Sequence, residues 1–244
     1  MQLLNVHTLR LTTFYDQDTP PYAILSHTWE DEEILYGDVC DQEKPLPQQK
    51  KGFFKVKRSC EQAACDGFDW VWIDTCCIDK SSSAELSEAI NSMFRWYNDS
   101  EICYAYISDV IKADADSVRF ENSRWFTRGW TLQELLAPKI VVFFDTKWQK
   151  IGWRGHELLA NKIFEATGIP QDLLERGDTS VAQRFSWASR RSTKRVEDEA
   201  YCLLGIFGVN MPLLYGEGSK AFFRLQQEIL RATNDQSILA FQHT

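Results

Sequence analysis

The sequence predicts an α/β fold, in which an open, mostly parallel sheet is flanked by helices and followed by a C-terminal helical annex. Three observations support this prediction. Short apolar runs alternate with segments of helical spacing over the first 150 residues, and such alternation is typical of parallel sheets with right-handed crossovers. Beyond about residue 150, helical spacing continues without a convincing strand. With 244 residues, of which 44% are hydrophobic, the chain can bury a large core.

Four apolar runs provide the expected strands, over residues 22–27, 70–74, 102–107 and 140–144. Each is short and bounded by polar or turn-forming residues, as buried strands are. The last run is apolar throughout, which favours a central position because a central parallel strand is covered on both faces.

Three helical segments are expected between these strands, over residues 47–65, 84–97 and 123–136. The first is amphipathic and stops at Gly67, a typical helix end. Ser82 and Glu85 form a capping-box pattern at the start of the second. Pro138 ends the third, because proline cannot continue a helix. Four further helical segments, residues 155–167, 180–189, 197–207 and 219–232, form the expected annex.

Composition excludes several classes of partner and site. The net charge of −8 argues against nucleic acid and against anionic membranes as partners. No apolar stretch approaches the roughly 18 residues of a membrane span, and the N-terminus lacks the pattern of a secretion signal. Seven cysteines, an odd number, indicate reduced thiols, so a cytoplasmic location is expected.

Polar and aromatic residues follow the first two predicted strands. Ser26, His27 and Trp29 come after the first, and Asp74 and Asp79 after the second. Ligands of open parallel sheets bind beyond the carboxyl ends of the strands, so these five residues are candidates for substrate binding. Structural alternatives remain open: His27 could donate to a backbone carbonyl, and Asp74 could cap a loop.

The third helical segment carries an unusual pair of side chains. Trp130 and Glu134 are four residues apart and share one helix face. Leucines beside Glu134 indicate that its carboxylate is at least partly buried, and a buried carboxylate must be paired or used. An ion pair with Arg124 or Arg128 is the structural alternative to a functional role.

Common catalytic motifs are absent from the sequence. It contains no phosphate loop, no dinucleotide fingerprint and no Gly-x-Ser-x-Gly elbow. With no Cys-x-x-Cys and only four histidines, a metal site is not expected. The Gly-Glu-Gly-Ser segment at 216–219 is interpreted as a turn with Ser219 as an N-cap. The basic cluster of Arg190, Arg191, Lys194 and Arg195, followed by acidic residues, is interpreted as a solvated or ion-paired surface.

Several segments together resemble the fungal heterokaryon-incompatibility (HET) domain. They are residues 22–29 (YAILSHTW), 72–79 (WIDTCCID), 84–97 and 128–134 (RGWTLQE), then 187–190, 197–206 and 211–218. The resemblance covers nearly the whole chain. Lys80 departs from it, because many members have glutamine there, so a polar contact at this position is not transferred.

The resemblance implies a cytoplasmic module of fungal innate immunity that triggers programmed cell death when individuals of different genotype fuse. Such modules usually belong to larger receptor-like proteins, so this chain is expected to be an effector domain with further domains in the full protein. The family also looks distantly similar to Toll/interleukin-1 receptor (TIR) domains. This similarity implies a TIR-like, flavodoxin-like core over residues 1–150 and an annex of the same HET domain over residues 151–244.

In enzymatic TIR domains, a helix glutamate cleaves NAD, and the matching residue here is Glu134. The resemblance thus implies an NAD glycohydrolase with Glu134 as catalytic residue, NAD as substrate, no cofactor and activity through self-association. Trp29 or Trp130 would stack on a substrate ring, and the other strand-end candidates would position ribose or phosphate-linked groups. Two alternatives remain: a non-catalytic adaptor that signals by homotypic contacts, and a regulator that binds a nucleotide without turnover.

Overall fold

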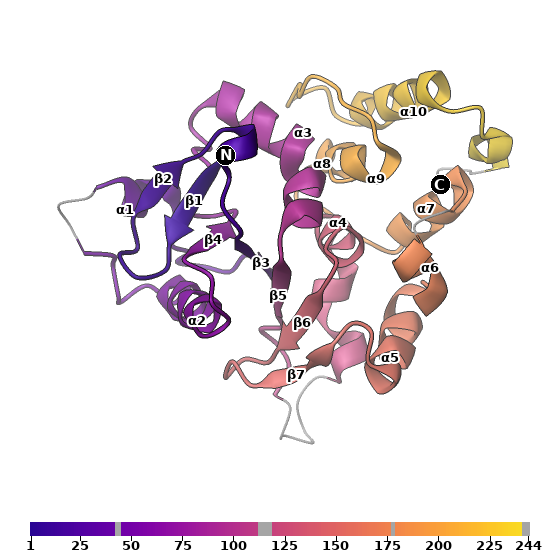
Figure 1. Ribbon diagram of the computed structural model, residues 1–244. Helices are drawn as coiled ribbons and strands as arrows, with labels where there is room; N and C mark the ends of the chain where they lie inside the picture. The colour runs from indigo at the N-terminus through magenta and orange to yellow at the C-terminus, as the bar shows by residue number, and fades with distance from the viewer. Residues whose placement is uncertain (42–44, 112–118, 177–178, 241–244) are drawn as a thin grey trace.

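The computed structural model describes residues 1–41, 45–111, 119–176 and 179–240, and within these ranges a single mixed sheet of seven strands forms the centre of the molecule (Figure 1). The strand order is β2-β1-β4-β3-β5-β6-β7. The strands are β1 (Gln2–Asn5), β2 (Leu11–Thr13), β3 (Ala23–His27), β4 (Trp70–Ile73), β5 (Ile102–Tyr106), β6 (Val141–Phe144) and β7 (Lys150–Trp153).

The four predicted strands are confirmed as the parallel centre of the sheet. They correspond to β4, β3, β5 and β6, which pair in parallel in this order. All residues of β3 and β6 are buried, as expected for strands covered on both faces. The fold class predicted from the sequence is therefore correct.

Three antiparallel edge strands were not predicted. β1 pairs with β2 and β4 at one edge, and β7 pairs with β6 at the other. The expectation of no strand beyond about residue 150 is wrong, because β7 spans Lys150–Trp153. Its two end residues are exposed, so this edge strand lacks the continuous apolar run that identifies a central strand.

Helices cover both faces of the sheet. α2 (Gly52–Cys65) packs against β4 on one face. α3 (Ser83–Asp99) and α4 (Thr131–Leu136) cover the other, where Trp72 of β4 meets Tyr97 at 5.8 Å between ring centroids and Ser26 of β3 donates to Glu134. α2 begins five residues later than predicted. The predicted capping serine of α3 is confirmed, since the Ser82 hydroxyl accepts from the backbone N–H of Glu85.

The helix predicted over residues 123–136 is broken in two. A 3₁₀ turn, η3 (Arg124–Thr127), is followed by extended backbone at Arg128 and then by α4. The break arises from a long-range pairing: Gly129 N–H donates to the carbonyl of Ser192 at 2.9 Å, and Ser192 N–H donates to that of Thr127 at 2.7 Å. Gly129 is required here because a Cβ would lie 2.5 Å from Cγ2 of Thr193.

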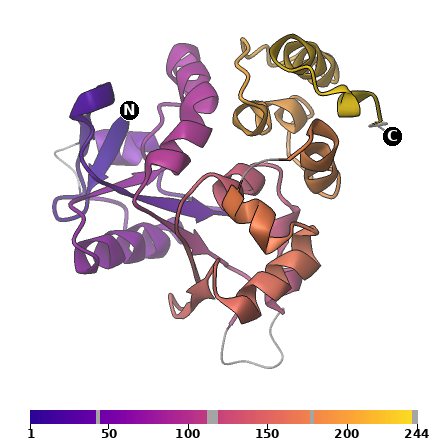
Figure 2. The ribbon, with the colours of Figure 1, turned by 45° about the vertical axis from the view of Figure 1, so that its right-hand side comes forward.

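The C-terminal part of the described chain is helical beyond β7. It contains α5 (Glu157–Thr167), α6 (Gln171–Arg176), α7 (Val181–Ala188), α8 (Asp198–Tyr201), α9 (Leu204–Phe207), α10 (Lys220–Ala232) and η4 (Gln236–Ala240). The single helix expected over residues 197–207 is divided into α8 and α9. Four further elements were not predicted: α1 (Tyr36–Cys40), α6, and the 3₁₀ turns η1 (Asp16–Asp18) and η2 (Phe120–Asn122). α9 packs on α3, which joins the annex to the sheet layer (Figure 2).

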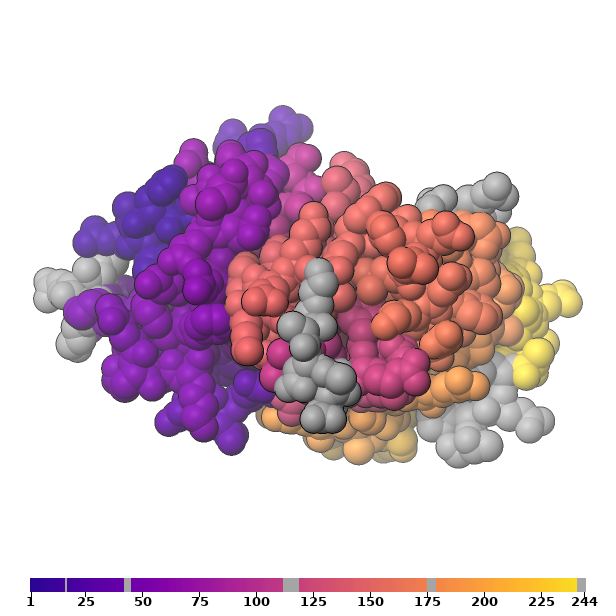
Figure 3. Space-filling model, turned by 90° about the horizontal axis from the view of Figure 1, so that it is seen from below, coloured from indigo at the N-terminus to yellow at the C-terminus, as the bar shows by residue number. Residues whose placement is uncertain are grey.

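The N-terminal strands and the last helix lie at opposite ends of the molecule. From below, the chain passes from β1 and α2 on one side, through β7 and α5, to the C-terminal helices on the other (Figure 3). Among the described helices, none combines the length and apolarity needed to cross a membrane.

Candidate functional site

A cavity of about 310 Å³ lies beyond the carboxyl ends of β3 and β4. The sheet contributes His27 and Asp74, α4 contributes Glu134, and the annex contributes Asp198 and Tyr215. This is the edge of a parallel sheet at which ligands bind. The cavity therefore combines residues of the α/β core with residues of the annex.

Glu134 is buried in the wall of this cavity, with 7% of its surface exposed. Its carboxylate accepts a hydrogen bond from the Ser26 hydroxyl, and Ser26 Oγ in turn accepts from the indole N–H of Trp125 at 2.9 Å. Burial raises the pKa of Glu134 to about 8, although the hydrogen bond from Ser26 acts in the opposite direction. Glu134 is thus a carboxyl group that gains or loses its proton near neutral pH.

The ion pairs considered as a structural role for Glu134 are not formed. Arg124 pairs instead with Glu30 and donates to Ser108 Oγ at 3.0 Å. Arg128 lines the cavity, yet within the described residues no cation lies within ion-pair distance of Glu134. Among the described side chains, the carboxyl group therefore has no ion-pair partner, although the charges of Arg128 and Arg191 act at longer range and oppose the raised pKa of Glu134.

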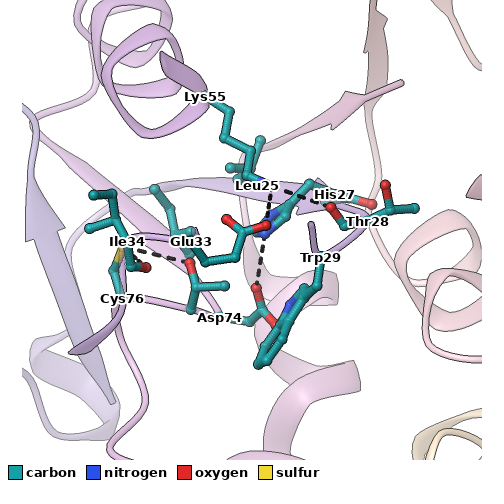
Figure 4. Close-up of polar contacts among 12 residues, drawn as sticks. Leu25, His27, Thr28, Trp29, Glu33, Ile34, Lys55, Asp74 and Cys76 are labelled. Atoms are coloured by element: carbon teal, nitrogen blue, oxygen red, sulfur yellow. Dashed lines mark hydrogen bonds and ion pairs between the residues drawn. The ribbon is translucent and has the colours of Figure 1, made fainter. Parts of the chain in front are cut away.

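Asp74 lies between His27 and Trp29 in the lining of the cavity (Figure 4). Its Oδ2 accepts from the indole N–H of Trp29 at 2.7 Å, and its Oδ1 lies 3.7 Å from Nε2 of His27. Lys80 donates to the backbone carbonyl of Asp74 at 2.8 Å and places its ammonium 3.7 Å from the centroid of the Trp29 ring. One face of Trp29 is therefore already covered by a cation.

His27 is buried with unused hydrogen-bonding capacity. Only 5% of the residue is exposed, and neither ring nitrogen has a hydrogen-bond partner within the described part of the chain. The alternative that His27 donates to a carbonyl is therefore wrong. Burial lowers the pKa of His27 well below its usual value, and the positive charge of Lys55 acts in the same direction. The ring is neutral and can both donate to and accept from a ligand.

The annex closes the remaining side of the cavity. Asp198 accepts from the Tyr215 hydroxyl at 2.9 Å and from the side chain of Trp130, which it holds in place. The guanidinium of Arg195 stacks on Tyr215, 4.5 Å from the ring centroid, and Lys194 lies beside it in the lining. The basic cluster was interpreted as surface only. Lys194 and Arg195 are indeed exposed, but they also line the site.

Five of the seven predicted site residues line the cavity, namely His27, Trp29, Asp74, Trp130 and Glu134. Ser26 lies directly behind Glu134 as its hydrogen-bond donor. Asp79 does not line the cavity, because its carboxylate accepts from the backbone and hydroxyl of Ser81, at 2.9 and 2.6 Å.

The glycine-rich turn before α10 is capped differently from the prediction. The carboxylate of Glu197 accepts from the N–H groups of Gly216 and Gly218 at 2.8 and 3.1 Å. Ser219 makes no side-chain cap, so its predicted N-cap role is wrong. The amides of this turn are satisfied by Glu197 and do not face an external anion. In the described ranges, no cluster of three or more potential metal ligands occurs.

Comparison with known proteins places these features in a family context. A family model described as "Heterokaryon incompatibility protein (HET)" matches residues 22–117, which include β3, β4 and the residues that follow them. The chain is 49% identical, over 223 residues, to the Vegetative incompatibility protein HET-E-1 of Podospora anserina. That alignment covers 86% of this chain and 16% of the relative's length. No solved structure shows a significant match.

Proposed function

Since the chain belongs to the heterokaryon incompatibility (HET) family, we propose that it acts in incompatibility cell death by hydrolysing NAD to nicotinamide and ADP-ribose. The observation that carries this proposal is the environment of Glu134. Its carboxyl group is buried, lines a cavity and has no cationic partner among the described side chains. Such a group can interact with a positive charge that a ligand brings.

A single carboxylate is enough for this reaction. Ordinary glycosidases use a second carboxyl group as an acid, because their leaving group departs as an alkoxide. Nicotinamide leaves the pyridinium form of NAD as a neutral molecule and needs no proton. As the bond from the ribose to the pyridinium nitrogen breaks, its electron pair leaves with nicotinamide and positive charge develops on the ribose. An ionised Glu134 stabilises the positive charge on the ribose in the transition state more strongly than it stabilises the ground state.

The raised pKa of Glu134 fits a cationic substrate. With a pKa of about 8, the carboxyl group is largely protonated at neutral pH in the free protein. A unit positive charge about 4 Å away contributes roughly 4 kcal/mol at an effective dielectric of about 20. This energy is sufficient to lower the pKa of the carboxyl group by roughly three units, to near 5. The substrate cation would thus ionise the group that acts on it.

Water completes the reaction. It attacks the anomeric carbon of the ribose, and the carboxylate of Glu134 is placed to accept its proton. The overall balance is NAD plus water to nicotinamide, ADP-ribose and one proton. Within the described chain neither ring nitrogen of His27 makes a hydrogen bond, so His27 would hold a ribose hydroxyl or the nicotinamide amide. Asp74 already orients Trp29 and would hold that wall in place.

The test is release of nicotinamide from NAD by the purified domain, next to Glu134→Gln. Glutamine keeps the size of the side chain and an oxygen that accepts from Ser26, so the variant should remain folded. We expect release by the wild type and a loss of about 10³-fold in kcat/KM in the variant, the magnitude that corresponds to roughly 4 kcal/mol. Wild-type protein that releases no nicotinamide at high concentration, or a fully active variant, would refute the proposal.

Self-association is part of the proposed function, because an effector of cell death has to remain inactive until it is clustered. Specific activity should therefore rise with protein concentration. Size-exclusion chromatography at the same concentrations measures the oligomeric state. A monomer with full activity would remove this part of the proposal and leave the hydrolysis itself intact.

A further inference from the structure

The charged residues that line the cavity differ in exposure. The less exposed part of the lining contains Glu134, which is 7% exposed, and Asp74, whose side chain is 22% exposed, together with the ammonium of Lys80 against Asp74. Three cations, Arg128, Lys194 and Arg195, line the side formed by the annex and the start of α4, and the latter two are exposed at the surface. The cavity therefore has two exposed cations and the half-buried Arg128 on one side, which we call the rim, and two carboxyl groups, Glu134 and Asp74, in its more buried part.

The three rim cations are available to a ligand. In the part of the chain that is described, no carboxylate lies within ion-pair distance of Arg128, Lys194 or Arg195. Asp198 lies on the same wall and interacts with the charge of Arg195 at longer range, but its hydrogen bonds are accepted from Tyr215 and Trp130. Arg195 is held in position by stacking on Tyr215. The fourth cation of the cavity, Lys80, lies apart from the rim against Trp29 and the carbonyl of Asp74.

We infer that Arg128, Lys194 and Arg195 form a diphosphate subsite, so that the substrate of this cavity is a dinucleotide whose pyrophosphate binds at the rim while its pyridinium riboside reaches Glu134. This inference rests on the proposed function for the orientation of the substrate. Guanidinium and ammonium groups bind phosphate oxygens through charge-assisted hydrogen bonds. The cations of the rim and the two carboxyl groups of the more buried part match a molecule with a cationic ring at one end and a dianionic linker next to it.

The subsite predicts selection by the number of phosphates. Nicotinamide riboside carries the same scissile bond as NAD but no phosphate, so it engages Glu134 without the rim. We expect the double variant Lys194→Gln/Arg195→Gln to lower kcat/KM for NAD about 10-fold more than for nicotinamide riboside, a selectivity change that corresponds to roughly 1.4 kcal/mol. The Michaelis constant for NAD should also rise with ionic strength, because the rim is exposed to solvent.

Two further variants distinguish an effect of the rim cations on substrate selectivity from an effect of net charge or of misfolding. Lys57→Gln/Arg58→Gln removes two positive charges from the exposed face of α2, outside the cavity, and should leave the selectivity unchanged. Lys194→Arg/Arg195→Lys keeps both charges at the rim and should retain most of the selectivity. Thermal melting of each variant reports on folding. Equal losses for both substrates in the Gln/Gln variant, or an equal selectivity change in the α2 control, would overturn the inference.

Binding of ADP-ribose tests the diphosphate subsite independently of NAD hydrolysis. If the wild type does not turn over NAD, the hydrolase proposal fails, and titration calorimetry with ADP-ribose then tests the subsite alone. Binding of ADP-ribose that weakens about 10-fold in the Gln/Gln variant, but not in the α2 control, supports the subsite. Absence of ADP-ribose binding by the wild type, or equal binding by the Gln/Gln variant, overturns it.

Discussion

Glutamine at position 134 should stabilise the fold increasingly as the pH rises. In the folded protein burial raises the pKa of Glu134 to about 8, whereas in an unfolded chain a glutamate titrates near 4.3. The folded state thus holds this proton more tightly, so the contribution of Glu134 to stability is fully present below about pH 4 and is lost as the pH rises toward 8. Glu134→Gln has no such titration at this position and avoids the loss.

The size of the effect follows from the two pKa values. Between pH 5 and pH 8, the unfolded carboxyl group is ionised while the folded one is still largely protonated. Integrated over this range, the difference in unfolding free energy between variant and wild type should increase by roughly 3 to 4 kcal/mol. Groups that titrate identically in both proteins cancel from this difference.

Urea unfolding at pH 5, 6, 7 and 8 measures the difference for both proteins. Glu88→Gln is a matched control, since it removes an exposed carboxylate of α3, and its difference from wild type should stay flat across this range. A flat difference for Glu134→Gln as well would show that Glu134 is ionised in the folded protein. A cationic substrate would then have no proton to displace from Glu134, whatever the outcome of the nicotinamide assay.

Three further predictions concern the site and its support. The kcat/KM for NAD should rise with pH and level off above about 8, since the free protein must lose the Glu134 proton. Nicotinamide release measured between pH 6 and 9 tests this, and a flat profile would contradict it. Gly129→Ala should lower the unfolding free energy in urea by about 2 kcal/mol, because its Cβ would lie 2.5 Å from Thr193 Cγ2. Lys80→Ala should lower the Michaelis constant for NAD about threefold, because it removes the side chain that covers one face of Trp29 and lets a cationic ring stack there. An unchanged constant would exclude stacking at this face.

The sequence predicts those parts of the fold that depend on local patterns. β6 is recognised because it is a continuous apolar run, and β3 because its first three residues, Ala23 to Leu25, are apolar and buried. β7 has no such run, because it lies at an edge and exposes Lys150 and Trp153. The break before α4 is also invisible locally, since it results from pairing with Ser192, which is more than sixty residues away in the sequence. Gly129 is the only local sign of it.

The same distinction applies to the site. Trp130 and Glu134 are found from their spacing, and Ser26, His27 and Asp74 from their positions at strand ends, because both rules describe neighbours within one sheet or helix. Lys194 and Arg195 are not found. Their charged neighbours in the sequence suggest solvated surface, and only the path of the chain back to α4 brings them to the cavity.

That return path explains why the annex is part of the site. Arg191 donates to the backbone carbonyl of Arg128 and to the Thr131 hydroxyl, both at 2.9 Å, and so holds the start of α4 from the annex side. Asp198 holds the side chain of Trp130 in the same way. The helix that carries Glu134 has only six residues, too few to be stable by itself. Its position, the burial of Glu134 and hence the raised pKa of that carboxyl group therefore depend on contacts from both the core and the annex.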